Sequence, residues 1–230
     1  MSQPVNSYVD PFVGTDAHIA GESLAERAYR EIRDRLVMLD IRPGAPINED
    51  QLGASLGIGR TPVREALKRL ADERLVVAYP RRGTFATDVQ ITDLAHISEV
   101  RQHLEPVAAA NAALRATAAE RTAFAELADR LQAPATAGLA APELLRIDLQ
   151  AHRALYAATH NPFLQDTLVR YDNLATRIWC LLLPRLAGVA GHVGEHGPLL
   201  EAVAAGNADH AAELARSHVI HFEQEVRAAL

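Results

Sequence analysis

Residues 60–67, with the sequence RTPVREAL, restrict the local fold more strongly than any other stretch of this chain. Pro62 has no amide hydrogen, so it fits only the first turn of a helix, where that donor has no partner. Arg60 and Arg64 are four residues apart and Lys68 continues their row, so these side chains share one helical face. Apolar residues at 63, 66, 67 and 70 form the opposite face. We therefore predict an amphipathic helix that presents arginines in its first turn, although a basic face by itself is more often simply solvated.

The segments before this helix predict a helix-turn-helix. Residues 23–39 carry apolar side chains at a helical period, and Pro43-Gly44 interrupts that pattern. A short helix is expected over 49–56, followed by a tight turn at Gly57-Ile58-Gly59. A short helix, a glycine turn and a basic helix in this order are typical of a helix-turn-helix.

The segments after the basic helix predict a wing. Residues 75–79 and 84–87 are rich in β-branched and aromatic residues, and they enclose Pro80-Arg81-Arg82-Gly83. We expect a two-stranded hairpin with a basic tip. A hairpin in this place would bring its arginines to phosphates or into the minor groove of DNA.

This pattern closely resembles the GntR superfamily of bacterial winged-helix transcription regulators. The matching residues are Leu36, Pro43, Gly44, Leu52, Leu56, Gly57, Arg60 to Leu67, Leu70, Leu75, Val76 and Arg81 to Gly83. The resemblance implies that Arg60, Thr61 and Arg64 contact operator DNA, with Lys68 on the same face. It also implies that the wing-tip glycine, Gly83, approaches the DNA backbone, beside Arg81 and Arg82 of the predicted basic tip.

The chain departs from this family pattern at three positions. Gly59 stands where a serine or threonine usually caps the helix, which costs about a few tenths of a kcal/mol. Arg74 replaces a glycine at a position where a left-handed conformation is common. Asp50 is acidic where some relatives carry a DNA-contacting arginine, so no DNA contact is predicted for it.

The distribution of charge limits how the chain can bind DNA. Residues 21–88 hold 12 Lys and Arg against 11 Asp and Glu, whereas residues 89–230 hold 11 against 16. Because the first half is nearly neutral, we expect DNA binding to depend on a local basic face, with modest non-specific affinity.

No apolar run approaches the ~18 residues of a membrane span, and no secretory signal is present. The lone Cys180 fits a reducing compartment, so we expect a cytoplasmic protein with no membrane association.

Composition divides the chain into three parts, and the fold class expected is mainly α. Residues 1–20 lack periodicity and are predicted to be a flexible tail, and residues 21–88 form the winged-helix domain. Residues 89–230 are rich in alanine and leucine and are predicted to form an all-α bundle of six or seven helices. The expected helices lie near 90–116, 118–132, 142–159, 162–185, 195–205 and 207–228, with a loop over 133–141.

Four polar residues of the second half are candidates for a metal site. Asp148 and His152 are four residues apart on the helix predicted over 142–159, so they point the same way. Alone, such a pair is more often an ordinary hydrogen bond than a pair of ligands. His196 begins a later helix and His218 lies 22 residues further on, so the two would meet only through a helical hairpin.

Asp-x3-His followed by two histidines 22 residues apart resembles the FadR-type branch of the same superfamily, which carries an FCD effector-binding domain. The resemblance covers roughly residues 90–230. It implies that Asp148, His152, His196 and His218 hold a divalent metal inside a helical bundle. The alternative is four polar groups that are separately hydrogen-bonded in the core. Three imidazoles and a carboxylate suit Zn²⁺, which we expect, or Ni²⁺, Co²⁺ or Mn²⁺.

A small carboxylate effector is expected beside this metal. Four protein ligands leave one or two coordination positions open on a five- or six-coordinate ion. Arg101 falls on the buried face of its helix, and a buried guanidinium requires an anion. That anion is either Glu105, one turn along the helix, or the carboxylate of a bound effector. Asn173 and Arg177 share one face of the helix over 162–185 and are weaker candidates for the same cavity.

Other polar and aromatic residues are predicted to be structural. His192 and His221 are near ligand candidates and could orient them, but we expect surface positions for both. Trp179, on a helix rich in leucine, is expected in the core or in a dimer interface.

These patterns together predict a homodimeric DNA-binding transcription regulator and not an enzyme. Its two-fold symmetry would match a pseudo-palindromic operator. We expect a repressor whose operator affinity is controlled by a small organic acid bound over the metal. One alternative is a regulator that responds to the metal directly. Another is a metal-dependent hydrolase, since aspartate and three histidines can activate water, although no separate general acid or base accompanies the ligands.

Overall fold

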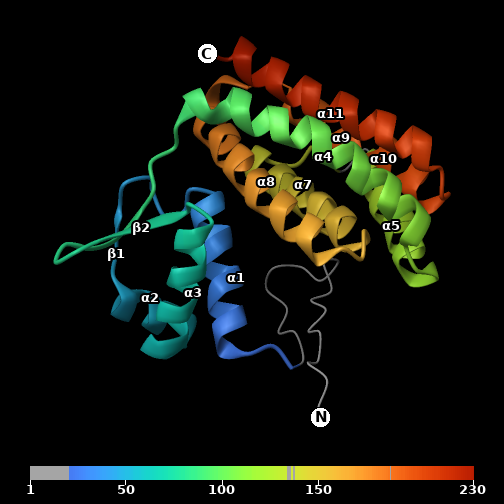
Figure 1. The fold of residues 1–230 in the computed structure, drawn as a ribbon. Helices are drawn as coiled ribbons and strands as arrows, with labels where there is room; N and C mark the ends of the chain where they lie inside the picture. Colours follow the sequence, from blue (N-terminus) through green and yellow to red (C-terminus); the bar gives the residue numbers. More distant parts are fainter. Residues whose placement is uncertain (1–20, 134–135, 137, 187) are drawn as a thin grey trace. The chain divides into compact units, whose positions relative to one another are not determined.

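The computed structural model describes residues 21–230 apart from residues 134, 135, 137 and 187. The tail predicted for residues 1–20 and part of the loop predicted over 133–141 lie outside the described residues. The chain forms two compact units that meet in sequence between Val89 and Gln90 (Figure 1). In the described part of the chain, every helix is too short or too polar to cross a membrane.

The first unit is a winged helix-turn-helix. Its elements are α1 (Leu24–Val37), β1 (Pro46–Ile47), α2 (Glu49–Leu56), α3 (Arg60–Asp72), β2 (Val76–Tyr79) and β3 (Gly83–Ala86). The predicted bounds of α2 are confirmed, since Asn48 caps its first turn and Gly57 ends it with a φ of +64°. The apolar face predicted for α3 is buried against α1 and α2, which leaves the basic face outside.

The wing is part of a three-stranded sheet with strand order β1-β3-β2. The predicted hairpin is formed by β2 and β3, in which Tyr79 pairs with Gly83. The third strand, β1, was not predicted; its Pro46 pairs with Phe85. A strand of two residues has no periodicity, and its partner lies far away in sequence, so local patterns do not reveal it.

The second unit is an all-α bundle, in agreement with the prediction of six or seven helices. Its α-helices among the described residues are α4 (Leu94–Arg115), α5 (Ala118–Gln132), α7 (Ala141–Ala157), α8 (Pro162–Leu182), α9 (Val189–Gly194), α10 (His196–Ala204) and α11 (Ala208–Ala228). Short 3₁₀ turns, η1 (Ile91–Asp93) and η2 (Leu183–Arg185), precede α4 and follow α8. The predicted capping box of Thr117 and Glu120 begins α5, and Asn161 caps α8.

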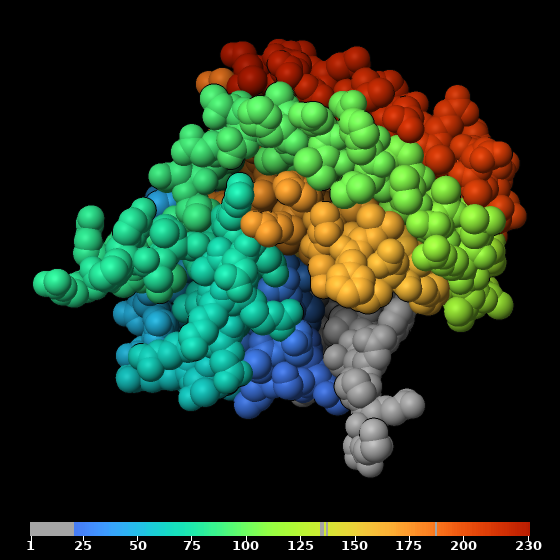
Figure 2. Space-filling model, in the orientation of Figure 1, coloured from blue at the N-terminus to red at the C-terminus, as the bar shows by residue number. Residues whose placement is uncertain are grey.

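The most extensive pairings in this bundle are those of α4 with α11 and of α5 with α10. The long helices α4 and α11 pack along each other, and α4 also packs against α8 (Figure 1). On the side of the unit shown in Figure 2, α4 (green) and α8 (orange) are neighbours at the surface. Helix α7 packs against α8 on one side and contacts α9 and α10 on the other, so its middle lies in the centre of the bundle.

Helix α9 is an addition to the predicted elements. Its sequence, VAGHVG, contains two glycines, which are poor helix formers. Only six residues long, it depends on packing against α7 and α11 more than on its own propensity.

Candidate metal centre and nucleic-acid interface

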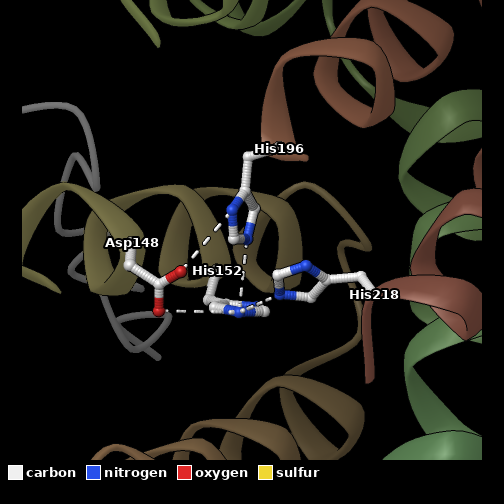
Figure 3. Close-up of side chains that lie close together, drawn as sticks. All are labelled: Asp148, His152, His196 and His218. Carbon is white, nitrogen blue, oxygen red and sulfur yellow. Dashed lines mark hydrogen bonds and ion pairs between the residues drawn. The ribbon is translucent and has the colours of Figure 1, made fainter. Parts of the chain in front are cut away.

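The structure brings together the four predicted metal ligands (Figure 3). Asp148 and His152 lie one turn apart on α7, His196 is the first residue of α10, and His218 lies in the middle of α11. All four side chains are buried, and their ligand atoms lie within 4.8 Å of one another. As predicted, a hairpin joins α10 to α11; it turns at Gly206, whose φ is +77°.

The spacing of the imidazole nitrogens fits one ion. The Nε2 atom of His152 lies 3.3 Å from Nε2 of His196 and 3.4 Å from Nε2 of His218. Nitrogens that bind one ion at about 2.0–2.1 Å lie about 2.9–3.4 Å apart, from octahedral to tetrahedral angles, so these separations fit an ion with four, five or six ligands. The carboxylate of Asp148 completes the set, with Oδ2 at 3.9 Å from His152 Nε2.

The hydrogen bonds of the other imidazole nitrogens determine where the protons are. Nδ1 of His218 lies 3.0 Å from a carboxylate oxygen of Glu195, and Nδ1 of His196 lies 3.3 Å from the carbonyl of Val193. A carbonyl oxygen and an ionised carboxylate can only accept, so with Glu195 ionised both Nδ1 atoms carry the proton. The Nε2 atoms of His196 and His218 therefore present lone pairs.

The hydrogen bonds of Tyr156 indicate that His152 has the same tautomer, with its proton on Nδ1. The hydroxyl of Tyr156 donates to Glu105 Oε1 at 3.0 Å, so its oxygen accepts from His152 Nδ1 at 3.1 Å. Three Nε2 lone pairs then face one another in a buried space, and none can donate to the others. Arg101 Nη2 lies 3.5 Å from His152 Nε2 and offsets part of the repulsion between these lone pairs, and a cation among the nitrogens would offset the rest.

Burial prepares these groups for metal binding. It lowers the pKa of His152, His196 and His218, that of His196 to about 4, so the imidazoles are neutral near pH 7. Metal ligation requires neutral imidazole. Burial and the nearby carboxylate of Asp172 raise the pKa of Asp148, and its Oδ1, although 3.5 Å from His196 Nδ1, forms no hydrogen bond. A cation would remove both penalties, so the residues present fit a divalent metal.

Arg101 lies beside this cluster and contacts two carboxylates. Its Nε donates to Glu105 Oε1 at 2.5 Å, and its Nη2 lies 3.3 Å from Asp172 Oδ1. The Glu105 partner was one of the two predicted anions, whereas Asp172 was not anticipated. The same Nη2 lies 3.5 Å from His152 Nε2, so the guanidinium is next to the ligand nitrogens. Its predicted burial on α4 is confirmed.

The weaker effector candidates lie on α8. Asn173 and Arg177 are both buried, one turn apart, in the helix that also carries Asp172. The amide nitrogen of Asn173 has no hydrogen-bond partner, and its oxygen is 3.5 Å from Arg153 Nη2.

The surface position predicted for His192 is wrong. Its ring is 3% exposed and stacks on His218 with 4.1 Å between ring centroids. It also meets the edge of Trp179 at 4.4 Å, so Trp179 lies in the core, as one of its two predicted positions allowed. The error arose because α9, which carries His192 into the bundle, was not predicted. His221, by contrast, is exposed as expected.

The predicted DNA-contacting residues of α3 lie on its outer face. Arg60, Thr61, Arg64 and Lys68 are all exposed. Arg60 Nη2 donates to Asp50 at 2.8 Å, and Arg64 Nε donates to Glu49 at 2.6 Å. Both acids belong to α2. Exposed pairs of this kind contribute little to stability, so DNA can replace the acidic partners at small cost.

The wing presents a second basic group. Arg81, Arg82 and Gly83 lie at the exposed turn between β2 and β3. The turn requires left-handed backbone at Arg81 (φ +63°) and Gly83 (φ +94°). The Arg82 guanidinium lies over the Tyr79 ring, 5.8 Å from its centroid, and remains exposed.

Comparison with known proteins identifies both units. Residues 24–86 match the gntR family of bacterial regulatory proteins, and residues 96–221, more than half of the chain, match the FCD domain. The chain belongs to the GntR family and carries an FCD domain. It is therefore a DNA-binding transcription regulator, and its family consists of regulators and not enzymes.

The relatives of this FCD regulator extend over most of its length. An uncharacterized HTH-type transcriptional regulator from an unstable DNA locus of Streptomyces ambofaciens is 28% identical over 88% of this chain and 85% of its own. The regulator McbR of Escherichia coli is 27% identical over 69% of this chain and 70% of its own. The solved structure of Escherichia coli McbR/YncC superposes with a TM-score of 0.73 at 23% identity, covering 90% of this chain and 96% of that one. This likeness supports the fold.

Proposed function

We propose that this FCD regulator holds a divalent metal between Asp148, His152, His196 and His218 and senses a small organic acid bound to that metal. The observation that carries the proposal is the convergence of three Nε2 lone pairs, whose Nδ1 atoms are all held by acceptors. Zn²⁺ is the first choice for this ligand set, and Ni²⁺, Co²⁺ and Mn²⁺ accept the same ligands.

Arg101 supports a carboxylate as the effector. Its guanidinium borders the ligand nitrogens, so a carboxylate bound at an open metal position would lie within its reach. The effector would then share Arg101 with Glu105 and Asp172. The amide nitrogen of Asn173, which has no hydrogen-bond partner, supplies a further buried donor, and the buried Arg177 adds positive charge in the same helix.

We also propose that the chain acts as a homodimeric repressor at a pseudo-palindromic operator, in the cytoplasm of a bacterium. Val107 and Leu114 are exposed and seven residues apart on α4, so they form one apolar stripe. Phe163, at the start of the neighbouring α8, is exposed as well. A second copy that covers these side chains would supply the two-fold symmetry that such operators match. A coupling free energy of ~1–3 kcal/mol between effector binding and DNA binding changes the operator affinity about 5- to 150-fold, which is sufficient for regulation.

The DNA contacts are tested by substitution on α3. Arg60→Ala and Arg64→Ala should each weaken specific operator binding by about ten- to a hundredfold in a gel-shift titration. Lys68→Ala, which removes a charge one turn further along the helix, should weaken binding to all sequences similarly. Unchanged operator affinity in both arginine variants would contradict the proposed contacts.

The sensing function is tested by a thermal-shift screen of small carboxylic acids on metal-loaded protein, because a bound ligand raises the apparent stability. An acid that raises the melting temperature should also release operator DNA, and both effects should be lost in Arg101→Ala. Operator release by metal alone, with no acid having any effect, would instead make the protein a direct metal sensor.

A further inference from the structure

A second group of imidazoles and carboxylates lies on the solvent side of the four metal ligands. It comprises His192 on α9, Glu195 before α10, and His221 and Glu225 on α11, and we call it the rim cluster. On α11, residues 218, 221 and 225 are three and four positions apart, so the inner ligand His218 and the rim side chains share one helical face.

Glu195 connects the rim cluster to the inner ligands. One of its oxygens accepts from His218 Nδ1 at 3.0 Å, and the other accepts from His221 Nδ1 at 2.9 Å. The side chain of Glu195 is 34% exposed and that of His221 is 52% exposed, so both meet solvent. Nδ1 of the buried His192 lies 3.7 Å from Glu195, and His192, Glu195 and His218 offer ligand atoms within 4.8 Å of one another.

Two atoms of the rim cluster are buried without partners. Nδ1 of His192 has no hydrogen-bond partner, although the side chain is almost completely buried. Oε2 of Glu225 is also buried and unpartnered, and burial together with the charge of Glu195 raises the pKa of Glu225. Among the described residues, neither Glu195 nor Glu225 forms an ion pair with a lysine or arginine. Unpartnered buried polar atoms in a native protein require an explanation, of which a missing ion is one.

We propose that His192, Glu195, His221 and Glu225 form a second divalent-cation site, which serves as the loading position for the inner site. Two imidazoles and two carboxylates are a borderline ligand set that suits transition ions such as Zn²⁺. Because part of the set is exposed and must rearrange around the ion, it binds more weakly than the inner four. An ion held there is one carboxylate away from His218, whereas the inner ligands themselves are closed to solvent.

The site goes beyond the proposed function, since neither effector nor operator is involved, but its loading role rests on the inner site.

The metal-free full-length protein is titrated with Zn²⁺, and the ions per chain are counted by native mass spectrometry. We expect two ions per chain in the wild type. His152→Ala should retain one, the rim ion, and the double variant His221→Ala, Glu225→Gln should also retain one, the inner ion.

His210→Ala is the matched control. His210 lies on the same helix and also faces a glutamate, Glu213, at 4.0 Å, but this pair is fully at the surface. The control should still bind two ions. A wild type that binds one ion, or a double variant that binds two, would overturn the rim site and leave the proposed function intact. A wild type that binds none would overturn both.

The loading role has its own measurement. After mixing with a limiting amount of Zn²⁺, samples are quenched at increasing times with a chelator that removes the weakly held rim ion, and the ion retained at the inner site is counted by native mass spectrometry. The double variant should fill the inner site at least tenfold more slowly than His210→Ala. Equal rates would overturn the loading role.

Discussion

The hydroxyl of Tyr156 shows how one atom outside the ligand set prepares a metal ligand. It donates to Glu105 and thereby accepts from His152 Nδ1, which leaves the lone pair of His152 on Nε2, the nitrogen that faces the other ligands. The sequence contained a signal for this role, because Tyr156 follows His152 by four residues on one helix face. Glu195 had no such signal, because the imidazole it accepts from, His218, lies 23 residues away. Asp172 had no such signal, since only the packing of α8 against α4 brings it to Arg101.

Removing this hydroxyl should weaken the inner site without removing a ligand. We expect Tyr156→Phe to lower metal affinity by about 10- to 100-fold, because His152 loses the acceptor that holds its tautomer and orientation. Competition with a chromophoric chelator measures the change. Tyr171→Phe, on α8, is the control and should bind metal as the wild type does. If Tyr156→Phe also leaves the affinity unchanged, the tautomer assignment of His152 is wrong.

Arg74 is strained by its backbone. It adopts a φ of +63° where the family resemblance places a glycine, and its carbonyl accepts from the Thr87 hydroxyl at 2.8 Å. The atoms of the Arg74 side chain beyond Cβ do not stabilise this backbone conformation. Its Cβ atom disfavours the left-handed conformation. Arg74→Gly should therefore raise the free energy of unfolding by about 0.5–1 kcal/mol in urea titrations. Arg74→Ala keeps Cβ and should show no such gain; equal effects of the two would show that the backbone is not the cause.

At the scale of elements, the α10–α11 hairpin decides whether His196 and His218 meet. Arg121 of α5 holds the end of α10, with Nη1 at 3.1 Å from the carbonyl of Val203 and 3.0 Å from that of Ala204. The same guanidinium donates to the carbonyl of Ala113 at 2.6 Å, near the end of α4. One side chain thus satisfies terminal carbonyls of two helices, which otherwise lack partners within their own helix.

Loss of this guanidinium should loosen the hairpin. Arg121→Met keeps most of the apolar stem, and we expect it to lower the free energy of unfolding by about 2–3 kcal/mol, since partly buried carbonyls lose charged donors. Arg216→Met, at an exposed position of α11, should have little effect. Chemical denaturation of the two variants makes the comparison. Equal stabilities would mean that water replaces Arg121 without cost.

Elements with local signals in the sequence were predicted, whereas elements that depend on contacts with distant segments were not. The capping box at Thr117 and the Asn161 cap are local, and both helices begin where the sequence placed them. Strand β1 and helix α9 are short and have weak intrinsic preferences, so they form only through contacts with distant segments. Missing α9 also misplaced His192.

At the scale of the whole molecule, metal removal tests how far the inner site supports the helical unit. The ligands come from α7, α10 and α11, so an ion links three helices that are distant in sequence. Chelation should lower the melting temperature by about 5–15 °C, as expected for loss of a tightly bound ligand of the native state. Calorimetry with and without chelator measures the shift. The double variant Asp148→Ala, His152→Ala lacks the inner ion and should respond much less; a wild type that loses metal with no shift would contradict the linkage.

The sequence by itself determined the two-part architecture, the basic face of α3, the capped helices and, through the family resemblance, which four side chains would meet. These properties depend on residue spacing within a few turns or on long fixed patterns, which a linear chain displays directly. Only the tertiary structure decided the acid partners of Arg60 and Arg64, the burial of His192, the second carboxylate at Arg101 and the role of Glu195. Burial and these partners are set by segments ten or more residues away, and their approach is determined by packing of the whole unit and not by any local pattern.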